Sequence, residues 1–453
     1  MSGEPVLPDA AELRRRFAFR PELSLLYDRR HGLEHRLNET AATFVSCTFS
    51  SPEPASAVAG HLGITQDFAA GELARFWNRT VSAHTRPHPR RKSGAPPGWA
   101  AADLPFPLVI EVELTKVCNW HCDFCYNVWK VPDDYGRRAR SVTGGAGDGL
   151  HLPIEAARRI LDEAAANDCL RIRFSGGEPT LHPQFREIIA YAGAKGFDIE
   201  LFSNGTLIDQ SMASFLSRSG VRVLLVSVHG LAATHNRMTA NPRAFEHAMN
   251  AIRAGLGAGM TVLPECLVSA ENIGEVPGLV TRLAGLGVRH VSFMPYVPYG
   301  AQDPRRAVAL RAVQNLIGEC TQTTGGAVSF RVPCAPRHCL ETEPVPIRDR
   351  VAEEFDDHCA AGVLWMSVSY EGRLRHCPHS AVYAGDIAEG IGQVWRERIV
   401  STVREALQPS HPACAGCGQL AACQGGCHLG KVRSYPGAPP GRRLLPVITA
   451  GGR

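Results

Sequence analysis

The sequence predicts an α/β protein in which a partial (βα)6 barrel lies between a smaller N-terminal domain and a loop-rich C-terminal domain. Three observations lead to this prediction. Strand-like apolar runs alternate with helical patterns from residue 108 to 299, which is typical of βα units around a parallel sheet. Residues 84–98 are rich in proline and basic residues and lack apolar periodicity, which indicates a linker. The last hundred residues are rich in cysteine, glycine and proline.

The alternating segment accounts for the barrel. Strands are expected at 108–114, 170–174, 199–203, 223–227, 260–268 and 290–295. Helices are expected between them, at 154–166, 182–195, 209–217, 245–255 and 273–286. Six units are fewer than the eight that close a complete barrel, so we expect a TIM-like barrel that closes only in part. Residues 301–355 are less regular and are interpreted as a bridging region.

The composition and charge of the chain exclude several classes of protein and of partner. The chain has 453 residues, of which 44% are hydrophobic and 20% charged, as in ordinary globular proteins with a large core. A net charge of +4 is too small to indicate a nucleic-acid partner. No apolar run approaches the length of a membrane span, and the N-terminus carries no secretory signal pattern. We therefore expect no membrane partner and a cytoplasmic location.

Fifteen cysteines are too many for a reduced protein without a special use for thiolates. Seven of them lie in two groups, 118–125 and 414–427, and in a cytoplasmic protein such groups indicate metal rather than disulfides. The isolated cysteines are interpreted as small buried apolar residues: Cys47, Cys169, Cys266 and Cys320.

The first cysteine group is a loop that directly follows the first expected strand, where such folds carry their chemistry. It reads Thr115-Lys-Val-Cys118-Asn-Trp-His-Cys122-Asp-Phe-Cys125-Tyr126. Three thiolates at these spacings can bind three corners of a [4Fe–4S] cube. Because such a cube normally takes four cysteines, one iron stays open to an exogenous ligand. The alternative is structural zinc, but the only local fourth ligand would be His121 inside the loop.

Two further motifs follow in the alternating segment. Ser175-Gly176-Gly177-Glu178-Pro179 ends the second expected strand, and Ser203-Asn204-Gly205-Thr206 ends the third. Two glycines allow a ligand to approach the backbone closely, and Glu178 offers a carboxylate beside them. In this order, after a loop that also contains Asn119 and Tyr126, the motifs resemble those of the radical S-adenosylmethionine (SAM) superfamily.

The resemblance implies that Cys118, Cys122 and Cys125 hold the cluster and that its open iron chelates the methionine part of SAM. Reductive cleavage of SAM would give a 5′-deoxyadenosyl radical that takes hydrogen from a substrate carbon. The GGEP motif of this family contacts the methionine amino group, and the later segments lie near the ribose and the substrate. The SAM-binding residues so implied are Gly176, Gly177, Glu178, Pro179, Ser203, Asn204 and Ser227.

Other polar residues of the segment have less defined roles. His229 and His235 resemble residues near the ribose and substrate, but structural histidines fit them equally well, and family members often carry Asp at the position of His229. Further residues are expected to line the cofactor pocket: Asn272, Met294 and Pro295. The sequence does not identify a proton donor or acceptor, for which the candidates are Tyr126, Tyr296 and Glu265.

The C-terminal cysteines follow the pattern Cys359, Gly372-x4-Cys377, then Cys414-x2-Cys417-x5-Cys423-x3-Cys427. The last four alone could form a zinc knuckle. The full pattern resembles the SPASM extension, an auxiliary iron–sulfur domain, although its seventh cysteine is missing. The resemblance implies one or two auxiliary clusters. Cys359, Cys377 and Cys427 would belong to the first, and Cys414, Cys417 and Cys423 to the second, with His428 as a candidate replacement ligand.

The first 83 residues contain no metal pattern. Strands are expected at 23–27 and 32–37, and helices at 39–49, 54–62 and 68–79. This order resembles the winged-helix-like, PqqD-like element that recognises leader peptides in ribosomal peptide natural product pathways, where the peptide adds a strand to a sheet edge. The alternative is a nonspecific helical cap. A DNA-binding winged helix is disfavoured because no basic recognition helix is present.

The expected domains are therefore 1–83 for leader recognition, 84–104 as linker, 105–300 as radical SAM partial barrel, 301–355 as bridging region and 356–453 as SPASM domain. This order resembles peptide maturases, so we predict an enzyme that takes hydrogen from a precursor (leader plus core) peptide and installs a thioether, C–C or C–O cross-link. A flavodoxin or ferredoxin would supply electrons. Alternatives are an anaerobic sulfatase-type protein maturase, a small-molecule radical SAM enzyme, or an electron carrier, against which the intact Gly176–Pro179 motif argues.

Overall fold

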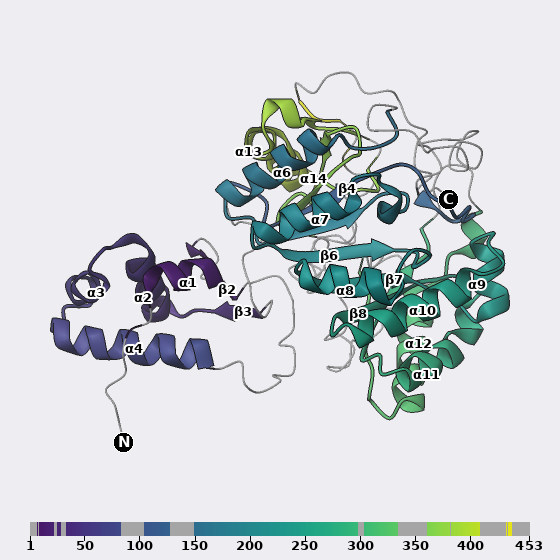
Figure 1. Cartoon of the computed structure of the whole chain (residues 1–453), viewed down its shortest axis with the longest axis horizontal. Helices are drawn as coiled ribbons and strands as arrows, with labels where there is room; N and C mark the ends of the chain where they lie inside the picture. The colour runs from purple at the N-terminus through teal and green to yellow at the C-terminus, as the bar shows by residue number, and fades with distance from the viewer. Residues whose placement is uncertain are drawn as a thin grey trace, which may run out of the picture. The chain divides into compact units, whose positions relative to one another are not determined.

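The computed structural model describes residues 7, 9–21, 25–28, 33–82, 104–126, 149–297, 303–333, 360–380, 382–407, 432 and 434–436. The chain divides into two compact units, Met1–Leu104 and Pro105–Arg453 (Figure 1). None of the helices in these described ranges has both the length and the apolar character needed to cross a membrane.

The N-terminal unit combines a small antiparallel sheet, in the order β1-β2-β3, with helices. Its elements are α1 (Ala10–Arg16), β1 (Phe17–Arg20), β2 (Leu25–Asp28), β3 (Leu33–Arg36), α2 (Glu39–Ser50), α3 (Pro54–Leu62) and α4 (Gln66–Ser82). The predicted strands correspond to β2 and β3 and the predicted helices to α2, α3 and α4, whereas α1 and β1 were not predicted. Local signals set the boundaries: the Asn38 side chain accepts a hydrogen bond from the Ala41 amide at 2.9 Å, and Pro54 begins α3.

Trp77 of α4 forms the centre of the N-terminal core. Its ring lies 5.4 Å from the ring of Phe17 in β1 and 5.8 Å from that of Phe49 in α2. The indole Nε1 donates to Thr48 Oγ1 at 3.0 Å, so the one polar atom of this fully buried side chain is satisfied. The sheet and the helices of this unit therefore share one core.

The second unit is built on a mostly parallel sheet in the order β10-β9-β8-β7-β6-β5-β4-β11-β12-β13, in which only the β11–β12 and β12–β13 pairs are antiparallel. Its strands are β4 (Val109–Glu113), β5 (Arg171–Ser175), β6 (Asp198–Ser203), β7 (Val221–Ser227), β8 (Thr261–Val268), β9 (His290–Pro295), β10 (Ser329–Arg331), β11 (Trp365–Val368), β12 (Arg373–Arg375) and β13 (Gly385–Asp386). The predicted α/β class with a parallel sheet is confirmed, and the six predicted strands correspond to β4 to β9.

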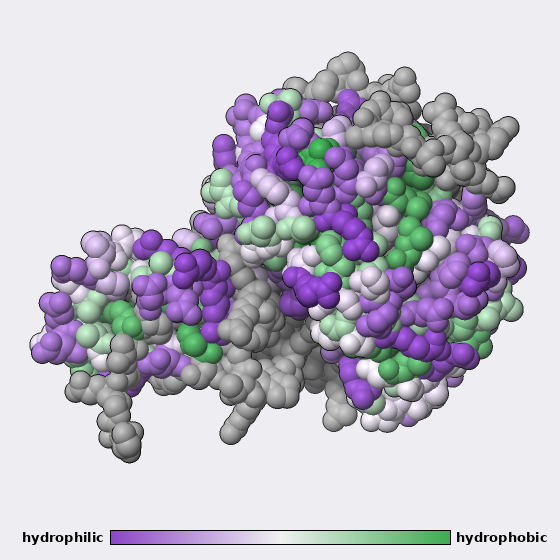
Figure 2. Space-filling view, in the orientation of Figure 1, coloured by the Kyte–Doolittle hydropathy of each residue, from purple (hydrophilic) through white to green (hydrophobic). Residues whose placement is uncertain are grey.

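Helices cover the outer side of this curved sheet (Figure 1). They are α6 (Ile154–Ala166), α7 (Phe185–Ala194), α8 (Gln210–Arg218), α9 (Ala232–Met238), α10 (Ala244–Gly257), α11 (Val276–Gly285) and α12 (Leu310–Thr323). In α6 the buried residues recur every three or four positions, as in Ala157, Ile160 and Ala164, so one stripe faces the core. Figure 2 shows that the outward surface over these helices is mostly hydrophilic.

The structure differs from the prediction at both edges of the barrel. In the segment 301–355, interpreted as irregular, the described residues form α12 and β10, and β10 pairs with β9 in parallel. The expectation of a loop-rich C-terminal region is wrong for residues 360–407, which contain β11 to β13, α13 (Ile391–Val394), a π-helical turn (Trp395–Val400) and α14 (Ser401–Leu407). A capping box of Asp386 and Glu389 precedes these helices and was a sequence signal for them.

Candidate cofactor and substrate site

A cavity of about 300 Å³ lies against the carboxyl ends of the strands of the large sheet. Residues at the ends of successive strands line it, among them Ser175 of β5, Ser203 of β6 and Ser227 of β7. The cysteine loop that follows β4 contributes Cys118, Cys122 and Cys125. Pro179, Met294 and Pro295 also line the cavity, whereas Asn272 is not among its lining residues.

The segment after β6 holds the cysteine loop in place. Asn204 Nδ2 donates to Asn119 Oδ1 at 2.7 Å, and Trp120 Nε1 donates to Thr206 Oγ1 at 3.0 Å. Cys118 is buried between these contacts, while Cys122 and Cys125 are half-buried. The Asn204–Thr206 turn therefore positions the loop, in addition to lining the cavity through Asn204.

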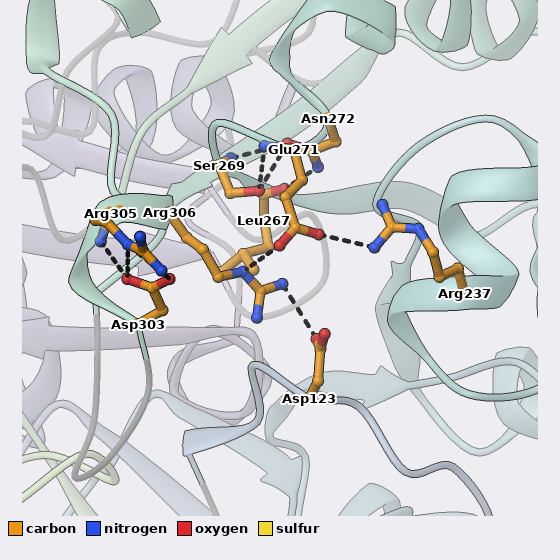
Figure 3. Close-up of polar contacts among 9 residues, drawn as sticks. All are labelled: Asp123, Arg237, Leu267, Ser269, Glu271, Asn272, Asp303, Arg305 and Arg306. Carbon is orange, nitrogen blue, oxygen red and sulfur yellow. Dashed lines mark hydrogen bonds and ion pairs between the residues drawn. The ribbon is translucent and has the colours of Figure 1, made fainter.

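The outer side of the loop is tied to two other segments. The amides of His121 and Asp123 donate to the carbonyl oxygens of Thr239 and Met238 at 3.1 and 3.2 Å, at the end of α9. Arg306 reaches Asp123 from the segment before α12, with Nη2 to Oδ1 at 3.2 Å (Figure 3). The sequence did not point to Arg306, which lies far from any motif.

The glycine pair after β5 packs against the cysteine loop itself. The amides of Gly177 and Glu178 donate to the carbonyl oxygens of Thr115 and Val117 at 2.6 and 2.7 Å. A Cβ at Gly177 would lie 2.1 Å from the Val117 oxygen, and one at Gly176, whose φ is +144°, would lie 2.5 Å from that of Thr115. We expected these glycines to make room for a ligand. In the structure both positions make room for the backbone of the loop, and both glycines also line the cavity.

The Glu178 carboxylate is buried and accepts four hydrogen bonds. They come from the Thr180 amide and hydroxyl, from Ser203 Oγ at 2.9 Å and from the Asn204 amide at 2.7 Å. Burial raises the pKa of this carboxyl group, and the Thr180 and Asn204 donors oppose that rise. Glu178 thus links the end of β5 to the end of β6, which aligns the two SAM-binding segments implied by the resemblance.

The donor set fits an iron–sulfur cube. Three thiols from one short loop line one cavity, and the amide of Trp120 donates to Cys118 Sγ at 3.4 Å. Among the described residues, no three His, Cys, Asp or Glu side chains are gathered closely enough to bind one metal ion. A cube places a different iron at each thiolate, so its ligands stand further apart than those of a single zinc ion.

His229 and His235 belong to a buried hydrogen-bonded network. His235 Nδ1 accepts from the His229 amide at 3.0 Å, and His229 Nδ1 accepts from the Leu267 amide at 3.1 Å. Asn272 Nδ2 donates to the carbonyl oxygens of His229 and Leu267. Burial lowers the pKa of both histidines, to about 3 for His235, so both are neutral. These contacts give the residues a structural role, although His229 also lines the cavity.

The C-terminal region reaches the same cavity through Cys377, Pro378 and His379. The Tyr126 ring lies 4.3 Å from that of His379, so the residue after the third loop cysteine contacts this segment. The other predicted auxiliary ligands lie outside the described residues: Cys359, Cys414, Cys417, Cys423 and Cys427.

Charged side chains on the inner face of the sheet complete the cavity lining: Glu111, Arg173, Glu265 and Arg331. Glu111 Oε1 accepts from Ser175 Oγ at 2.8 Å, and burial raises the pKa of Glu111 to about 7. Arg173 Nε donates to Glu200 Oε2 at 2.8 Å. Apart from Glu265, sequence reasoning missed these residues. The signal for Glu111 and Arg173 was a charged residue inside a predicted strand, whereas Arg331 lies in β10, which was not predicted.

Comparisons with known proteins match the part of the chain that contains this site. The sequence profile of the Radical SAM superfamily matches residues 112–283, from β4 to α11. An AdoMet-dependent heme synthase of Methanosarcina barkeri is 26% identical over 332 residues, which are 70% of this chain and 90% of the relative. Mycofactocin maturase MftC of Mycobacterium ulcerans is 24% identical over 355 residues, 74% of this chain and 86% of the relative.

The fold of this chain is similar to that of Streptococcus suis SuiB, with a TM-score of 0.63 at 16% identity over 91% of this chain and 94% of SuiB. SuiB has also been solved bound to S-adenosylmethionine and to the precursor peptide SuiA. The matched profile contains the cysteine loop and the glycine pair, and it implies a [4Fe–4S] cluster and SAM as cofactors. This chain thus contains a domain of the Radical SAM superfamily, over residues 112–283.

Proposed function

We propose that this protein is a radical SAM enzyme that modifies a ribosomally made precursor peptide. The observation that supports this proposal is that the structural likeness to SuiB extends into the N-terminal unit. The likeness to SuiB covers 91% of the chain, so about 41 of the 453 residues lie outside it. The N-terminal unit has 104 residues and is therefore too long to lie wholly outside it. At least part of the unit therefore has a counterpart in a protein that has been solved with its precursor peptide.

Residues 1–83 would recognise the leader of that peptide. Within the described residues, β1 and β3 are the edge strands of the small sheet. An extended peptide can add to such an edge through main-chain hydrogen bonds, while its side chains set the specificity. The unit has its own core around Trp77, so it can present an edge without the rest of the chain. Residues 84–104 would link it to the barrel.

The barrel would hold the cofactors and the reacting part of the peptide. Together the bound cluster and SAM supply a 5′-deoxyadenosyl radical able to take hydrogen from a substrate carbon. The chain contributes three thiolates to the cluster, and Glu178 and Asn204 fix the segments around them. The apolar wall of the cavity, with Phe202, Leu267 and Met294, would keep water from the reacting carbon. The product would be a thioether, C–C or C–O cross-link.

Residues 356–453 would form a SPASM domain with one or two auxiliary clusters, connected to the barrel by residues 301–355. Cys377, one of its predicted ligands, lines the cavity that contains the loop cysteines. A cluster there would be placed to accept the electron released when a cross-link forms. A flavodoxin or ferredoxin would supply the electron for SAM cleavage, and the enzyme would act in the cytoplasm.

A small-molecule substrate is the second candidate, because a relative that is 26% identical is a heme synthase. The two candidates differ in what the N-terminal unit is for. A peptide maturase needs it to bind its substrate, whereas an enzyme acting on a small molecule would not lose its reaction when the unit is removed.

The proposal is tested by reconstituting the protein without oxygen, with the Cys118→Ala/Cys122→Ala/Cys125→Ala variant beside it. We expect about twelve irons, or about eight with one auxiliary cluster, and about four fewer in the variant. Only the wild type should form 5′-deoxyadenosine from SAM and dithionite.

Mass spectrometry of a peptide encoded beside the gene should then show loss of hydrogen. Deletion of residues 1–83 should abolish peptide modification; full modification by the truncated protein would contradict leader recognition.

A further inference from the structure

Arg331 enters the cavity from the inner face of β10. The strand pairs in parallel with β9, with Arg331 opposite Ser292 and Phe330 opposite Val291. Phe330 stacks on Phe293 at 5.2 Å, away from the inner face, because neighbouring residues of a strand point to opposite sides. Arg331 lines the cavity, as do Pro333 just after it and Glu265 of β8.

The Arg331 guanidinium is uncommitted. It forms no hydrogen bond or ion pair with any residue that the structure describes, and its Nε is buried without a partner. Arg173, the other guanidinium that lines the cavity, is held by its Nε bond to Glu200. Arg331 as a whole is half-buried, but its buried Nε donor, left without an acceptor, costs about 1–3 kcal/mol. Such a group in a cavity is best explained by an acceptor that the substrate brings.

The neighbouring acids leave this position open to an anion. Glu200 is already paired with Arg171 at 3.3 Å and Arg173 at 2.8 Å, and these two arginines lower its pKa to about 2 despite its burial. Burial raises the pKa of Glu265, and the positive charge of Arg331 opposes that rise. The two side chains do not form an ion pair. Glu111 is bonded to Ser175 and has a pKa of about 7. Among the described residues, neither Glu265 nor Glu111 forms an ion pair with Arg331, so its donors remain open to another carboxylate.

We propose that Arg331 binds a carboxylate of the substrate and so orients the reacting residue in the cavity. A guanidinium presents its donors in a planar fork that fits a carboxylate with two parallel hydrogen bonds, and burial strengthens such bonds. For the peptide substrate proposed above, on which this inference rests, the carboxylate is either an aspartate or glutamate side chain or the C-terminus of the peptide.

The test uses the full chain, reconstituted, oxidised and loaded with SAM, and ligand-observed NMR titrations of two pairs of short probes. The first pair is N-acetyl-glycyl-aspartyl-glycinamide and its asparaginyl twin. The second is N-acetyl-glycyl-alanyl-glycine with a free carboxylate and the same peptide as an amide. We expect one carboxylate probe to bind about tenfold more tightly than its neutral twin. The pair that shows the difference identifies a side-chain or a C-terminal carboxylate as the ligand.

Arg331→Gln should reduce that preference to about twofold or less, and Arg331→Lys should retain part of it because the charge remains. The matched control is Arg253→Gln, at an exposed position of α10, which should keep the full preference. The proposal is overturned if the wild type shows no preference in either pair, or if Arg331→Gln keeps it. It is also overturned if Arg331→Gln weakens SAM binding instead, because the guanidinium would then serve the cofactor. A carboxylate preference without any peptide modification would support this site and count against the proposed function alone.

Discussion

Arg306 Nη2 donates to Asp123 Oδ1 at 3.2 Å and so connects the segment before α12 to the loop between Cys122 and Cys125 (Figure 3). The same guanidinium meets Glu271 Oε1 at 2.8 Å and lies 5.2 Å from the centre of the Tyr296 ring. Glu271 is paired in turn with Arg237 of α9 at 2.9 Å. Arg306 therefore braces the cysteine loop at Asp123, a different part of the loop from the one that the glycine pair contacts.

Removing this brace should loosen the cluster. In Arg306→Gln the charge-assisted contacts to Asp123 and Glu271 are lost, and the loop can open more often. Because Asp123 is half exposed, the contact is worth about 0.5–1 kcal/mol. We expect the reconstituted variant to lose iron to a chelator about two to five times faster than the wild type. Arg305→Gln is the control, because Arg305 is 88% exposed and pairs with Asp303 (Figure 3). Equal rates for Arg306→Gln and wild type would show that the brace does not act on the cluster.

Gly177→Ala should separate the glycine pair from the cysteine loop. The added Cβ would lie 2.1 Å from the Val117 carbonyl oxygen, so the two backbones must move apart. We expect a loss of at least about 1–3 kcal/mol in the free energy of unfolding, together with weaker SAM binding. Gly285→Ala, at the end of α11 with open space around it, should leave stability unchanged or raise it. Denaturant unfolding and a SAM titration check both variants; normal SAM binding by Gly177→Ala would contradict the packing argument.

Glu178→Gln should destabilise the barrel by about 1–3 kcal/mol. The carboxylate oxygens accept bonds from Thr180, Ser203 and Asn204, and an amide NH2 in place of either oxygen would face a donor. Thermal unfolding of the cluster-free protein measures the effect. Glu187→Gln is matched in chemistry but lies on the exposed surface, where its pair with Arg158 is worth little, so its unfolding temperature should stay near that of the wild type.

Glu111 should make stability depend on pH. Burial raises its pKa from 4.5 to about 7 in the folded protein, so the folded state binds the proton more tightly than the unfolded chain. The resulting stabilisation is fully present below about pH 4.5 and is lost as the pH rises through about 7. The free energy of unfolding is measured at pH 5 and pH 8 for the cluster-free wild type and for Glu111→Gln. From pH 5 to pH 8 the wild type should lose up to about 3 kcal/mol more than the variant. Parallel trends in the two proteins would rule out this role for Glu111.

The parts of the fold that the sequence predicted depend on neighbours along the chain. Strands β4 to β9 and the helices between them have the alternation and helical spacing that decide local structure. The three-residue strand β10 was not predicted, because it is defined by its parallel pairing with β9 rather than by its own residues. The same holds for β11, which pairs with β4 across more than 250 positions of sequence.

For the site, the sequence by itself determined where the chemistry is predicted: the spacing of Cys118, Cys122 and Cys125 and the Gly176–Pro179 motif resemble those of a radical SAM centre. Only the tertiary structure decided what surrounds them. It packed the glycine pair against the loop backbone and placed Cys377 at the same cavity. Among the described residues, it left the Arg331 Nε buried there without a partner. The physical reason is that ligand spacing is a local property of the chain, whereas burial, pairing and the loss of water depend on which distant segments the fold brings together.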